Sequence, residues 1–247
     1  MKRLMDIVIS FTGLLISAPL LLPVITIIWL QDFRSPFYIA PRVGKNGRTF
    51  KMVKLRSMVV GADRTGVTST SSKDPRITFI GRFVRTYKLD EFGQLWNVLV
   101  GDMSLVGPRP NVIKAVENYT LLEQHLLLAK PGVTDFSSVV YSDEGEILKD
   151  EPDPDIAYNQ LIRPPKSSLG LFYIEHQSIS VDIQLIWLTA VSMISRPLAL
   201  REIQRLLRRL GANQTILGLA SRQSPLIPMP PPGGDLVVTS RDGNPFI

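Results

Sequence analysis

An uncharged stretch near the N-terminus constrains the fold more than any other feature of this sequence. The 24 residues from Ile7 to Leu30 carry no formal charge. As a straight helix they would extend about 36 Å, enough to cross a hydrocarbon core of about 30 Å. A cleaved signal peptide has a shorter apolar region of roughly 7–15 residues before its cleavage site, whereas this run continues through Trp29 to Asp32. We therefore expect residues 1–34 to insert into a membrane.

Two prolines, Pro19 and Pro23, lie inside this stretch. Each proline removes a backbone donor and clashes with the preceding turn, so the helix is expected to break or kink near Ser17-Ala18-Pro19. Carbonyl groups that lose their partner in lipid need another donor, and the Ser17 hydroxyl is the candidate. We therefore assign Ser17 and Pro19 to a membrane break.

The charges beside the stretch bear on its topology. A kinked helix that spans the bilayer and a helix–break–helix that enters and leaves on one side both fit the prolines. Basic residues flank both ends: Lys2, Arg3, Arg34, Arg42 and Lys45. Because positive residues are retained on the cytoplasmic side, the pattern favours the re-entrant form, with the spanning helix as the alternative.

The composition excludes several kinds of active site. The 247 residues include no cysteine and two histidines, which excludes a thiol nucleophile and argues against a zinc site. Residues 34–88 hold thirteen basic side chains against two acidic ones. This balance suits nucleic acid, a lipid surface or a phosphorylated substrate, although a basic stretch is also often a solvated face. We expect no nucleic acid, because aromatic residues are not interleaved with the basic ones as in single-strand binding modules.

Turn signals divide the middle of the chain into short elements. Residues 37–39 and 48–53 flank Asn46-Gly47, a pattern that predicts a hairpin. Residues 60–76 are rich in Gly, Ser, Thr and Asp, which predicts a flexible surface loop. A helix is expected to begin near Asp74.

The segment from Leu89 to Pro110 combines charged side chains with an apolar stripe. Asp90 and Glu91 are adjacent, and the apolar spacing after them predicts a helix that ends at Gly101. Arg109 lies between two prolines, which restrict its backbone on both sides. Taken singly, Asp90 would be an N-cap, Glu91 an acid that faces the helix dipole, and Arg109 a surface charge.

Three segments together closely resemble the bacterial sugar transferase family, the monotopic phosphoglycosyl transferases that act on polyprenyl phosphate. They are Lys54–Met58, Arg85–Pro110 and Lys130–Ser138. The start of the chain is also similar, because a KR-x-x-D pattern precedes a proline-broken apolar helix. The likeness covers about residues 1–210, without the multi-span N-terminal extension of larger members, so we expect the minimal catalytic form.

The resemblance implies an enzyme that transfers a sugar-1-phosphate from a nucleotide diphosphate sugar to polyprenyl (undecaprenyl) phosphate and releases nucleoside monophosphate. This reaction would initiate a lipid-linked polysaccharide or glycoconjugate at the cytoplasmic face of the bacterial inner membrane. By resemblance, Asp90 is the nucleophile that forms a covalent aspartyl phospho-sugar intermediate, and Glu91 assists it. Asp90 would also contact the magnesium ion that the family uses. The oligomeric state is left open.

Cations are needed around this acidic pair, because a carboxylate that attacks a phosphodiester anion meets like-charge repulsion. Magnesium is satisfied by a carboxylate and phosphate oxygens, which suits a chain poor in His and Cys. By the family match, Arg56, Arg85 and Arg109 contact phosphate, whose geometry a guanidinium matches. Lys54 is a further candidate, with a solvated strand position as its alternative.

One segment departs from the family. After the PGVT sequence, many members carry an Asn-Gly-Arg-like segment associated with the sugar nucleotide, whereas residues 137–155 here contain no arginine. We therefore expect a sugar-recognition loop that is built differently, or else a solvated acidic loop.

The C-terminal third adds no catalytic group. Residues 169–194 are apolar but interrupted by charges, and residues 198–210 predict a basic amphipathic helix that lies on anionic lipid or packs on the domain. Residues 213–247 contain six prolines, which predict a flexible tail.

These patterns predict a mixed, helix-rich α/β fold. Its parts are a re-entrant membrane helix (1–34), a catalytic domain with amphipathic interfacial helices (35–212) and the Pro-rich tail (213–247). The expected partners are the nucleotide diphosphate sugar, polyprenyl phosphate and membrane lipid. The alternative function is a non-catalytic, membrane-anchored scaffold of a polysaccharide assembly complex.

Overall fold

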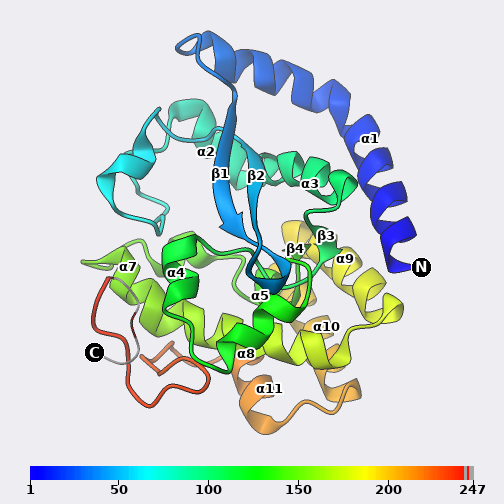
Figure 1. The fold of residues 1–247 in the computed structure, drawn as a ribbon, viewed down its shortest axis with the longest axis vertical. Helices are drawn as coiled ribbons and strands as arrows, with labels where there is room; N and C mark the ends of the chain where they lie inside the picture. The colour runs from blue at the N-terminus through cyan, green and yellow to red at the C-terminus, as the bar shows by residue number, and fades with distance from the viewer. Residues whose placement is uncertain (242–243, 245–247) are drawn as a thin grey trace.

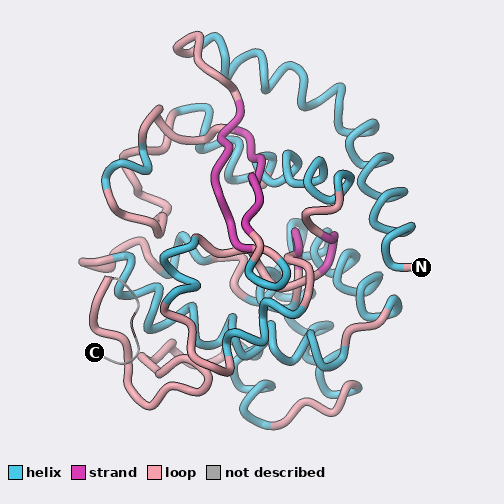
Figure 2. The backbone as a smooth tube through the Cα atoms, viewed as in Figure 1, coloured by secondary structure: helices cyan, strands magenta, loops and turns pink. Residues whose placement is uncertain are grey.

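The computed structural model of the chain describes residues 1–241 and residue 244. It has a mixed, helix-rich α/β fold, in which one long apolar helix precedes a globular domain (Figure 1). Helices and loops make up most of the domain, and the strands are confined to its middle (Figure 2). The strands are β1 (Phe37–Val43), β2 (Thr49–Leu55), β3 (Ser104–Val106) and β4 (Gly132–Thr134).

The helices are distributed along the whole described chain. The α-helices are α1 (Lys2–Leu30), α2 (Phe79–Thr86), α3 (Gln94–Val100), α4 (Ile113–Glu117), α5 (Phe136–Val140), α6 (Glu144–Ile147), α7 (Pro154–Ala157), α8 (Arg163–His176), α9 (Ile179–Ile194), α10 (Arg196–Arg209) and α11 (Gln214–Ser221). Short 3-10 turns are η1 (Lys45–Gly47), η2 (Ala62–Thr65), η3 (Leu89–Gly93) and η4 (Glu123–Leu128), and η5 (Tyr158–Ile162) is a π turn that leads into α8. Among the described residues, α1 is the helix whose length and composition would let it cross a membrane.

Helix α1 is continuous through both of its prolines. It bends along its course, so that its first part runs beside the domain and its second part turns across the top (Figure 1). Pro19 leaves the Leu15 carbonyl without its i→i−4 donor. The Ser17 hydroxyl donates to the neighbouring Leu14 carbonyl at 3.3 Å, not to that of Leu15. The helix therefore bends without a break, and Ser17 has a different partner from the one expected.

Polar side chains hold the N-terminal end of α1 on the domain. Lys2 Nζ donates to Asp182 of α9 at 2.5 Å and to the Tyr173 hydroxyl of α8 at 2.9 Å. Arg3 donates to two carbonyl oxygens near the end of α3, and the buried Asp6 accepts two hydrogen bonds from β3. The KR-x-x-D pattern is thus a docking element that binds the helix to α3, β3, α8 and α9 of the domain.

The other end of α1 is fixed to the same domain by apolar packing. The cluster there joins α1 to β2, α2 and η3 and contains Leu21, Val24, Ile28, Leu55, Val84 and Leu89. Arg56, just after β2, donates to the Ile28 carbonyl at 3.1 Å and pairs with Asp32 at 2.6 Å. Between the two ends, large apolar side chains of α1 are exposed: Phe11, Leu15, Ile16, Leu20 and Leu22.

The predicted hairpin is confirmed. Strands β1 and β2 pair antiparallel along seven residues each. Asn46 and Gly47 in the connection have φ of 57° and 76°, a left-handed conformation that these two residue types adopt at low cost. Lys54 lies near the end of β2, where the strand packs against η3.

The main core surrounds the short parallel pair of β3 and β4. Ser104 lies opposite Gly132, and Val106 lies opposite Thr134. Side chains of α5, α8, α9 and α10 complete this core, with Phe136 and Tyr173 among its largest buried members. After β3 the chain turns back at Gly107 and Pro108, which lie against the segment before β4.

The C-terminal segment packs on the domain. Helix α10 buries Ala199, Ile203, Leu206 and Leu207 against the domain. We expected this helix either to lie on anionic lipid or to pack on the domain, and the structure shows the packing. Farther on, Val238 is fully buried, and Gln160 exchanges hydrogen bonds with the backbone at Met229 and Val238. We expected a flexible tail here. The described part of the tail packs on the domain instead, because apolar residues between the prolines, such as Val238, supply buried contacts. Residues 242, 243 and 245–247 lie outside the described part.

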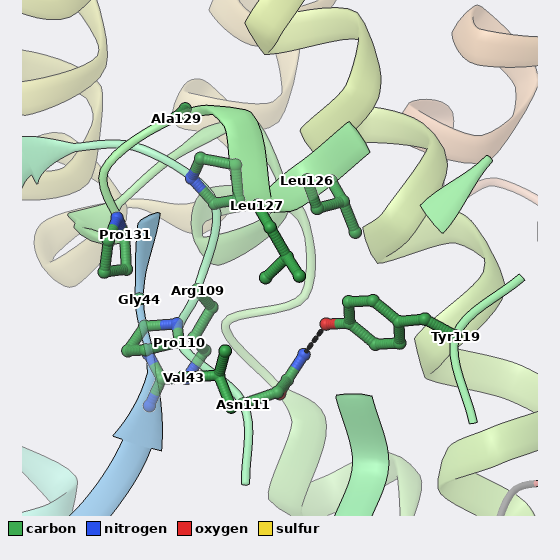
Figure 3. Close-up of a pocket in the computed structure, with 11 residues that line it drawn as sticks. Val43, Gly44, Arg109, Pro110, Asn111, Tyr119, Leu126, Leu127, Ala129 and Pro131 are labelled. Atoms are coloured by element: carbon green, nitrogen blue, oxygen red, sulfur yellow. Dashed lines mark hydrogen bonds between the residues drawn. The ribbon is translucent and has the colours of Figure 1, made fainter. Parts of the chain in front are cut away.

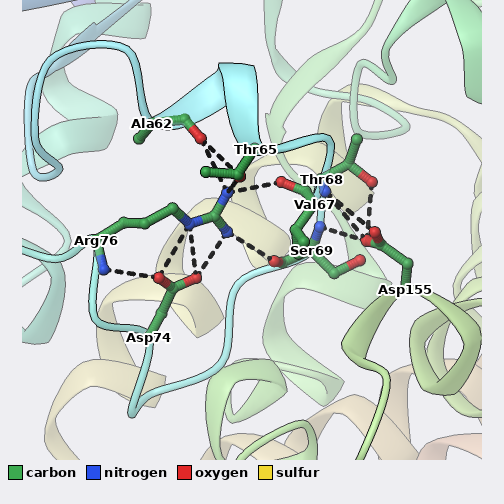
Figure 4. Close-up of polar contacts among 8 residues, drawn as sticks. All are labelled: Ala62, Thr65, Val67, Thr68, Ser69, Asp74, Arg76 and Asp155. Carbon is green, nitrogen blue, oxygen red and sulfur yellow. Dashed lines mark hydrogen bonds and ion pairs between the residues drawn. The ribbon is translucent and has the colours of Figure 1, made fainter.

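Polar contacts cross-link residues 60–76, which we expected to be a flexible loop (Figure 4). Arg76 pairs with Asp74 at 2.6 Å and donates to the Ala62 and Val67 carbonyls. The buried Asp155 accepts hydrogen bonds from the backbone of residues 68 and 69. The polar side chains that suggested flexibility are therefore bonded within the protein.

Candidate active site

The acidic pair lies on η3, between α2 and α3. This turn begins at Lys88, whose φ of 53° is in the left-handed region, an uncommon conformation for a lysine. Gly93 ends the turn against β2, where a Cβ atom would lie 2.9 Å from the Val53 carbonyl oxygen. Glycine at this position therefore lets η3 approach the hairpin and places the acidic pair beside β2.

Asp90 faces Lys54 across this contact. Its Oδ2 lies 3.6 Å from Lys54 Nζ, and the two side chains are only 13% and 18% exposed. Burial lowers the pKa of Lys54, with Arg109 adding to the shift and Asp90 opposing it. Asp90 caps neither η3 nor α3, so the N-cap interpretation does not hold. Lys54 is likewise not a solvated strand residue.

Glu91 is paired with Arg109. Its Oε1 lies 3.1 Å from Arg109 Nη1. Burial raises the pKa of Glu91, but the charges of Arg109 and Lys54 outweigh burial and hold this pKa below its ordinary value. Each member of the acidic pair therefore has its own cation.

The turn that presents Arg109 is held by the segment before β4. The Gly132 amide donates to the Pro108 carbonyl at 2.9 Å. A Cβ atom on Gly107 would lie 2.3 Å from the Lys130 carbonyl oxygen, so the two backbones touch only because residue 107 is glycine. Two of the segments that carry the family resemblance thus form one structural unit.

Arg85, in the last turn of α2, completes the cationic side of the site. Its Nη1 is buried and has no hydrogen-bond partner in the part of the chain that the structure describes. Burial lowers the pKa of Arg85, and the nearby Asp90 opposes this shift. A buried guanidinium with an unused donor, beside a carboxylate, is suited to receive a phosphate oxygen.

This constellation agrees with the comparison of the sequence with known proteins. The family model for bacterial sugar transferases matches residues 1–196. The chain belongs to the bacterial sugar transferase family. Within this family, it is 33% identical over 192 residues to the UDP-glucose:undecaprenyl-phosphate glucose-1-phosphate transferase of Klebsiella pneumoniae, covering 76% of the chain and 39% of the relative.

Two further relatives of this sugar transferase are similar over a shorter region. The UDP-galactose-lipid carrier transferase of Erwinia amylovora is 41% identical over 152 residues, which cover 54% of the chain and 31% of the relative. The undecaprenyl-phosphate galactose phosphotransferase of Salmonella typhimurium is 39% identical over 152 residues, with the same two coverages. The chain thus spans less than half the length of each of these three curated relatives.

The structure brings together five of the predicted site residues: Lys54, Arg85, Asp90, Glu91 and Arg109. It does not bring Arg56 to them, because that guanidinium is bound by Asp32 and the Ile28 carbonyl at the end of α1. Ser17 and Pro19 lie in the middle of α1, and their assignment to a membrane break stays a prediction.

Two charged residues near the site were not predicted. Glu144 of α6 accepts a hydrogen bond from Lys166 of α8. Burial raises the pKa of Glu144, but Lys166 and, with a smaller effect, Arg109 hold it below its ordinary value. The acidic stretch is therefore not simply solvated. In the sequence, the departure of residues 137–155 from the family pattern was the one sign that Glu144 could belong to a site. The sequence around Lys166 gave no such sign.

Arg109 borders two hollows in the domain. The first is lined by residues from the end of the hairpin and from η4, and in it Asn111 donates to the Tyr119 hydroxyl at 2.6 Å (Figure 3). The second shares Arg109 and Asn111 with the first and is lined further by Tyr158 and Lys166. Arg109 thus connects the acidic pair with the Glu144–Lys166 pair.

The carboxylate groups of the site also determine which metal ion it could bind. Within residues 1–241 and 244, no group of three or more His, Asp or Glu side chains is arranged to hold a metal ion. Asp90 and Glu91 could contribute one or two carboxylate ligands, and phosphate oxygens of a substrate would have to supply others. Magnesium is the ion that accepts such a mixed shell.

Proposed function

We propose that this sugar transferase moves a sugar-1-phosphate from a nucleotide diphosphate sugar to undecaprenyl or another polyprenyl phosphate. The observation that carries the proposal is the pairing of Asp90 and Glu91 with separate cations while Arg85 keeps an unused, buried donor. The names of the relatives, two of them undecaprenyl-phosphate transferases, support this substrate class. The product would initiate a lipid-linked polysaccharide or glycoconjugate.

The transfer proceeds in two displacements at one phosphorus atom. An oxygen of Asp90 attacks the phosphorus that bears the sugar, and the bond from that phosphorus to the nucleoside monophosphate breaks, with the leaving oxygen keeping the electron pair. This gives an aspartyl phospho-sugar. A phosphate oxygen of the polyprenyl phosphate then attacks the same phosphorus and releases the Asp90 carboxylate. Each half balances, and the order is ping-pong.

The residues around Asp90 have separate tasks in this proposal. Lys54 lowers the repulsion between the attacking carboxylate and the incoming phosphate, and Arg85 donates to a phosphate oxygen. Glu91 holds Arg109 in position beside the site. Asp90, with Glu91 beside it, would hold magnesium together with phosphate oxygens, and the ion would supply neutralisation of the phosphate charge.

The same proposal includes a position at the cytoplasmic face of the bacterial inner membrane. A straight spanning helix has its ends on opposite sides of the bilayer, whereas both ends of α1 contact one domain. The exposed apolar side chains between these ends would lie in lipid. This arrangement favours a re-entrant α1, with both basic flanks on the cytoplasmic side.

Trapping of the intermediate tests the proposal. Purified enzyme in detergent or nanodiscs is incubated with magnesium and a nucleotide-sugar panel labelled in the sugar, without the lipid acceptor. We expect one donor to release nucleoside monophosphate and to leave the label on Asp90, as found by peptide mass after acid quenching. Polyprenyl phosphate should then discharge the label into lipid.

Two controls make this test decisive. The Asp90→Asn variant should take up no label, and a chelator should prevent labelling of the unchanged enzyme. Labelling that persists in Asp90→Asn, or turnover that requires donor and acceptor bound together, would contradict the nucleophile assignment.

A further inference from the structure

Glu144 and Lys166 form the third acid–base pair near the catalytic site. The Glu144 carboxylate accepts a hydrogen bond from Lys166 Nζ. The Lys166 side chain is 12% exposed and that of Glu144 is 32% exposed. Lysine is thus the fixed, buried partner, and glutamate is the partner that already reaches solvent.

Lys166 lies in the hollow that Arg109 borders. The same hollow is lined by Tyr158 and by Ser137 and Ser167, whose hydroxyl groups already donate to internal carboxylates. The Lys166 ammonium lies 5.9 Å from the centre of the Tyr158 ring, and Arg109 enters from the turn after β3. The Lys166 ammonium and the Arg109 guanidinium are two cations that line one hollow, and such a pair suits a phosphate group.

The charge of Glu144 acts on two of the site's arginines. Its charge opposes the effect of burial on the pKa of Arg109 and of Arg85. An anionic substrate beside Arg109 would be attracted by the same cation.

The backbone under Glu144 is fixed independently of Lys166. The neighbouring Asp143 pairs with Arg196 of α10 and Arg222 after α11, each at 2.9 Å. The Ser72 amide donates to the Gly145 carbonyl at 2.9 Å. The Glu144 side chain can therefore leave Lys166 by rotation about its own bonds, without movement of α6.

We infer that Lys166 is a further donor-binding residue and that Glu144 is its internal counter-ion, which a phosphate group of the nucleotide diphosphate displaces. The inference rests on the proposed function, because it names a second phosphate contact in the same site. Of the three pairs, this is the one that can open without disturbing Asp90 or Glu91. Its acid has a path to solvent, and its base remains buried beside Arg109.

The two partners should then affect anion binding in opposite directions. Loss of Lys166 removes a donor, whereas loss of the Glu144 charge removes a competitor. An ion pair with a purely structural role would give losses of the same sign for both variants. This difference in sign separates the two explanations.

The experiment measures binding of inorganic pyrophosphate to the full chain in detergent micelles, by calorimetry at fixed ionic strength and without added magnesium. We expect Lys166→Gln to weaken binding roughly tenfold, the usual loss for one charge-assisted contact. Glu144→Gln should tighten binding about threefold, because a like charge is removed. Thermal unfolding of each variant confirms that it is folded.

The neighbouring exposed pair supplies matched controls. Glu146 and Lys149 lie 3.3 Å apart, and Glu146 belongs to the same helix as Glu144. Glu146→Gln and Lys149→Gln make the same charge changes, and pyrophosphate binding should stay within about twofold of the unchanged protein. A threefold gain in Glu146→Gln as well would overturn the counter-ion assignment, since net charge alone would then explain it.

Two other outcomes would also overturn the inference. One is weaker pyrophosphate binding in both Glu144→Gln and Lys166→Gln, and the other is unchanged binding in both. Because the measurement needs no turnover, it is separate from the trapping experiment on Asp90. A labelled Asp90 with either of these binding results would reject the counter-ion and leave the proposed reaction intact.

Discussion

Two lysine–aspartate pairs in this molecule have the same chemistry and opposite environments. Lys2 lies 2.5 Å from Asp182 and also donates to the Tyr173 hydroxyl and the Val106 carbonyl. Tyr173 in turn donates to the second oxygen of Asp182 at 2.6 Å. Lys54 and Asp90 are 3.6 Å apart, and neither side chain has a hydrogen bond to another part of the described chain.

The difference separates a structural pair from a chemical one. A buried charge whose donors and acceptors are all used rigidifies the protein and has no bonding capacity left for a ligand. A buried charge with unused capacity costs stability, and substrate binding can offset that cost. Hydrogen-bond saturation, more than burial, therefore separates Lys2–Asp182, which docks α1, from Lys54–Asp90, which the proposed function assigns to catalysis.

The largest effect is expected at Asp90. Asp90→Asn removes the nucleophile, so sugar-phosphate transfer should fall by at least about a thousandfold. The unfolding temperature should stay unchanged or rise, because the pair contributes no hydrogen bond that asparagine would lose. A radiolabelled-lipid assay and a thermal melt of the same preparation check both statements. A stable Asp90→Asn variant with more than a tenth of normal turnover would break the comparison.

Asp182→Asn should show the reverse pattern. It leaves Lys2 without its counter-ion in a network that also includes Tyr173 and the Val106 carbonyl. The expected loss is roughly 3 kcal/mol, which lowers the unfolding temperature by roughly 6–12 °C for a domain of this size. Turnover per folded molecule should remain near normal at low temperature. The double variant with Lys2→Met tests the coupling, since its loss should be smaller than the sum of the single losses.

The sequence pointed to the Lys54–Asp90 side of this comparison more clearly than to the Lys2–Asp182 side. Asn46-Gly47, Gly101 and the prolines around Arg109 control local backbone geometry, so the hairpin, the end of α3 and the turn after β3 could be predicted from neighbouring residues. The positions of Asp90 and Glu91 followed from the family resemblance. Their pairing with separate cations did not, because it depends on how η3 packs against β2.

Long-range polar pairs were the part that sequence reasoning could not reach. Lys2 and Asp182 are 180 positions apart, and nothing local links them. Arg56 was predicted to bind phosphate because of its motif, whereas in the structure it holds the end of α1. Glu144 and Lys166 come from a segment without a family pattern and from the first turn of a helix. Such pairs are determined by tertiary packing, which periodicity and turn signals do not encode.

Two arginines show the same contrast between a side chain with satisfied hydrogen bonds and one with an unused donor. The expected effect on turnover is smaller than at Asp90. Arg56 uses its guanidinium on Asp32 and the Ile28 carbonyl, whereas Arg85 has a buried Nη1 without a partner among the described residues. Arg85→Gln should lower kcat/KM for the nucleotide sugar by roughly 10- to 100-fold and leave the unfolding temperature unchanged. Arg56→Gln, the matched control, should lower the unfolding temperature with a smaller change in kcat/KM. If Arg85→Gln instead lowers the unfolding temperature and Arg56→Gln instead lowers kcat/KM, hydrogen-bond saturation does not identify functional residues in this protein.

The smallest effect is expected at a pair with better geometry than the catalytic one. Lys73 and Asp150 lie 2.8 Å apart, but their side chains are 62% and 79% exposed. Water and salt screen this attraction, and ordering two long side chains opposes it. Lys73→Gln should therefore change neither turnover nor the unfolding temperature, measured in the same assay and melt. A clear loss of either would mean that the contact between the 60–76 segment and the acidic stretch is itself required. The distance within an ion pair would then be a better guide to its role than its environment, contrary to the difference between Lys2–Asp182 and Lys54–Asp90.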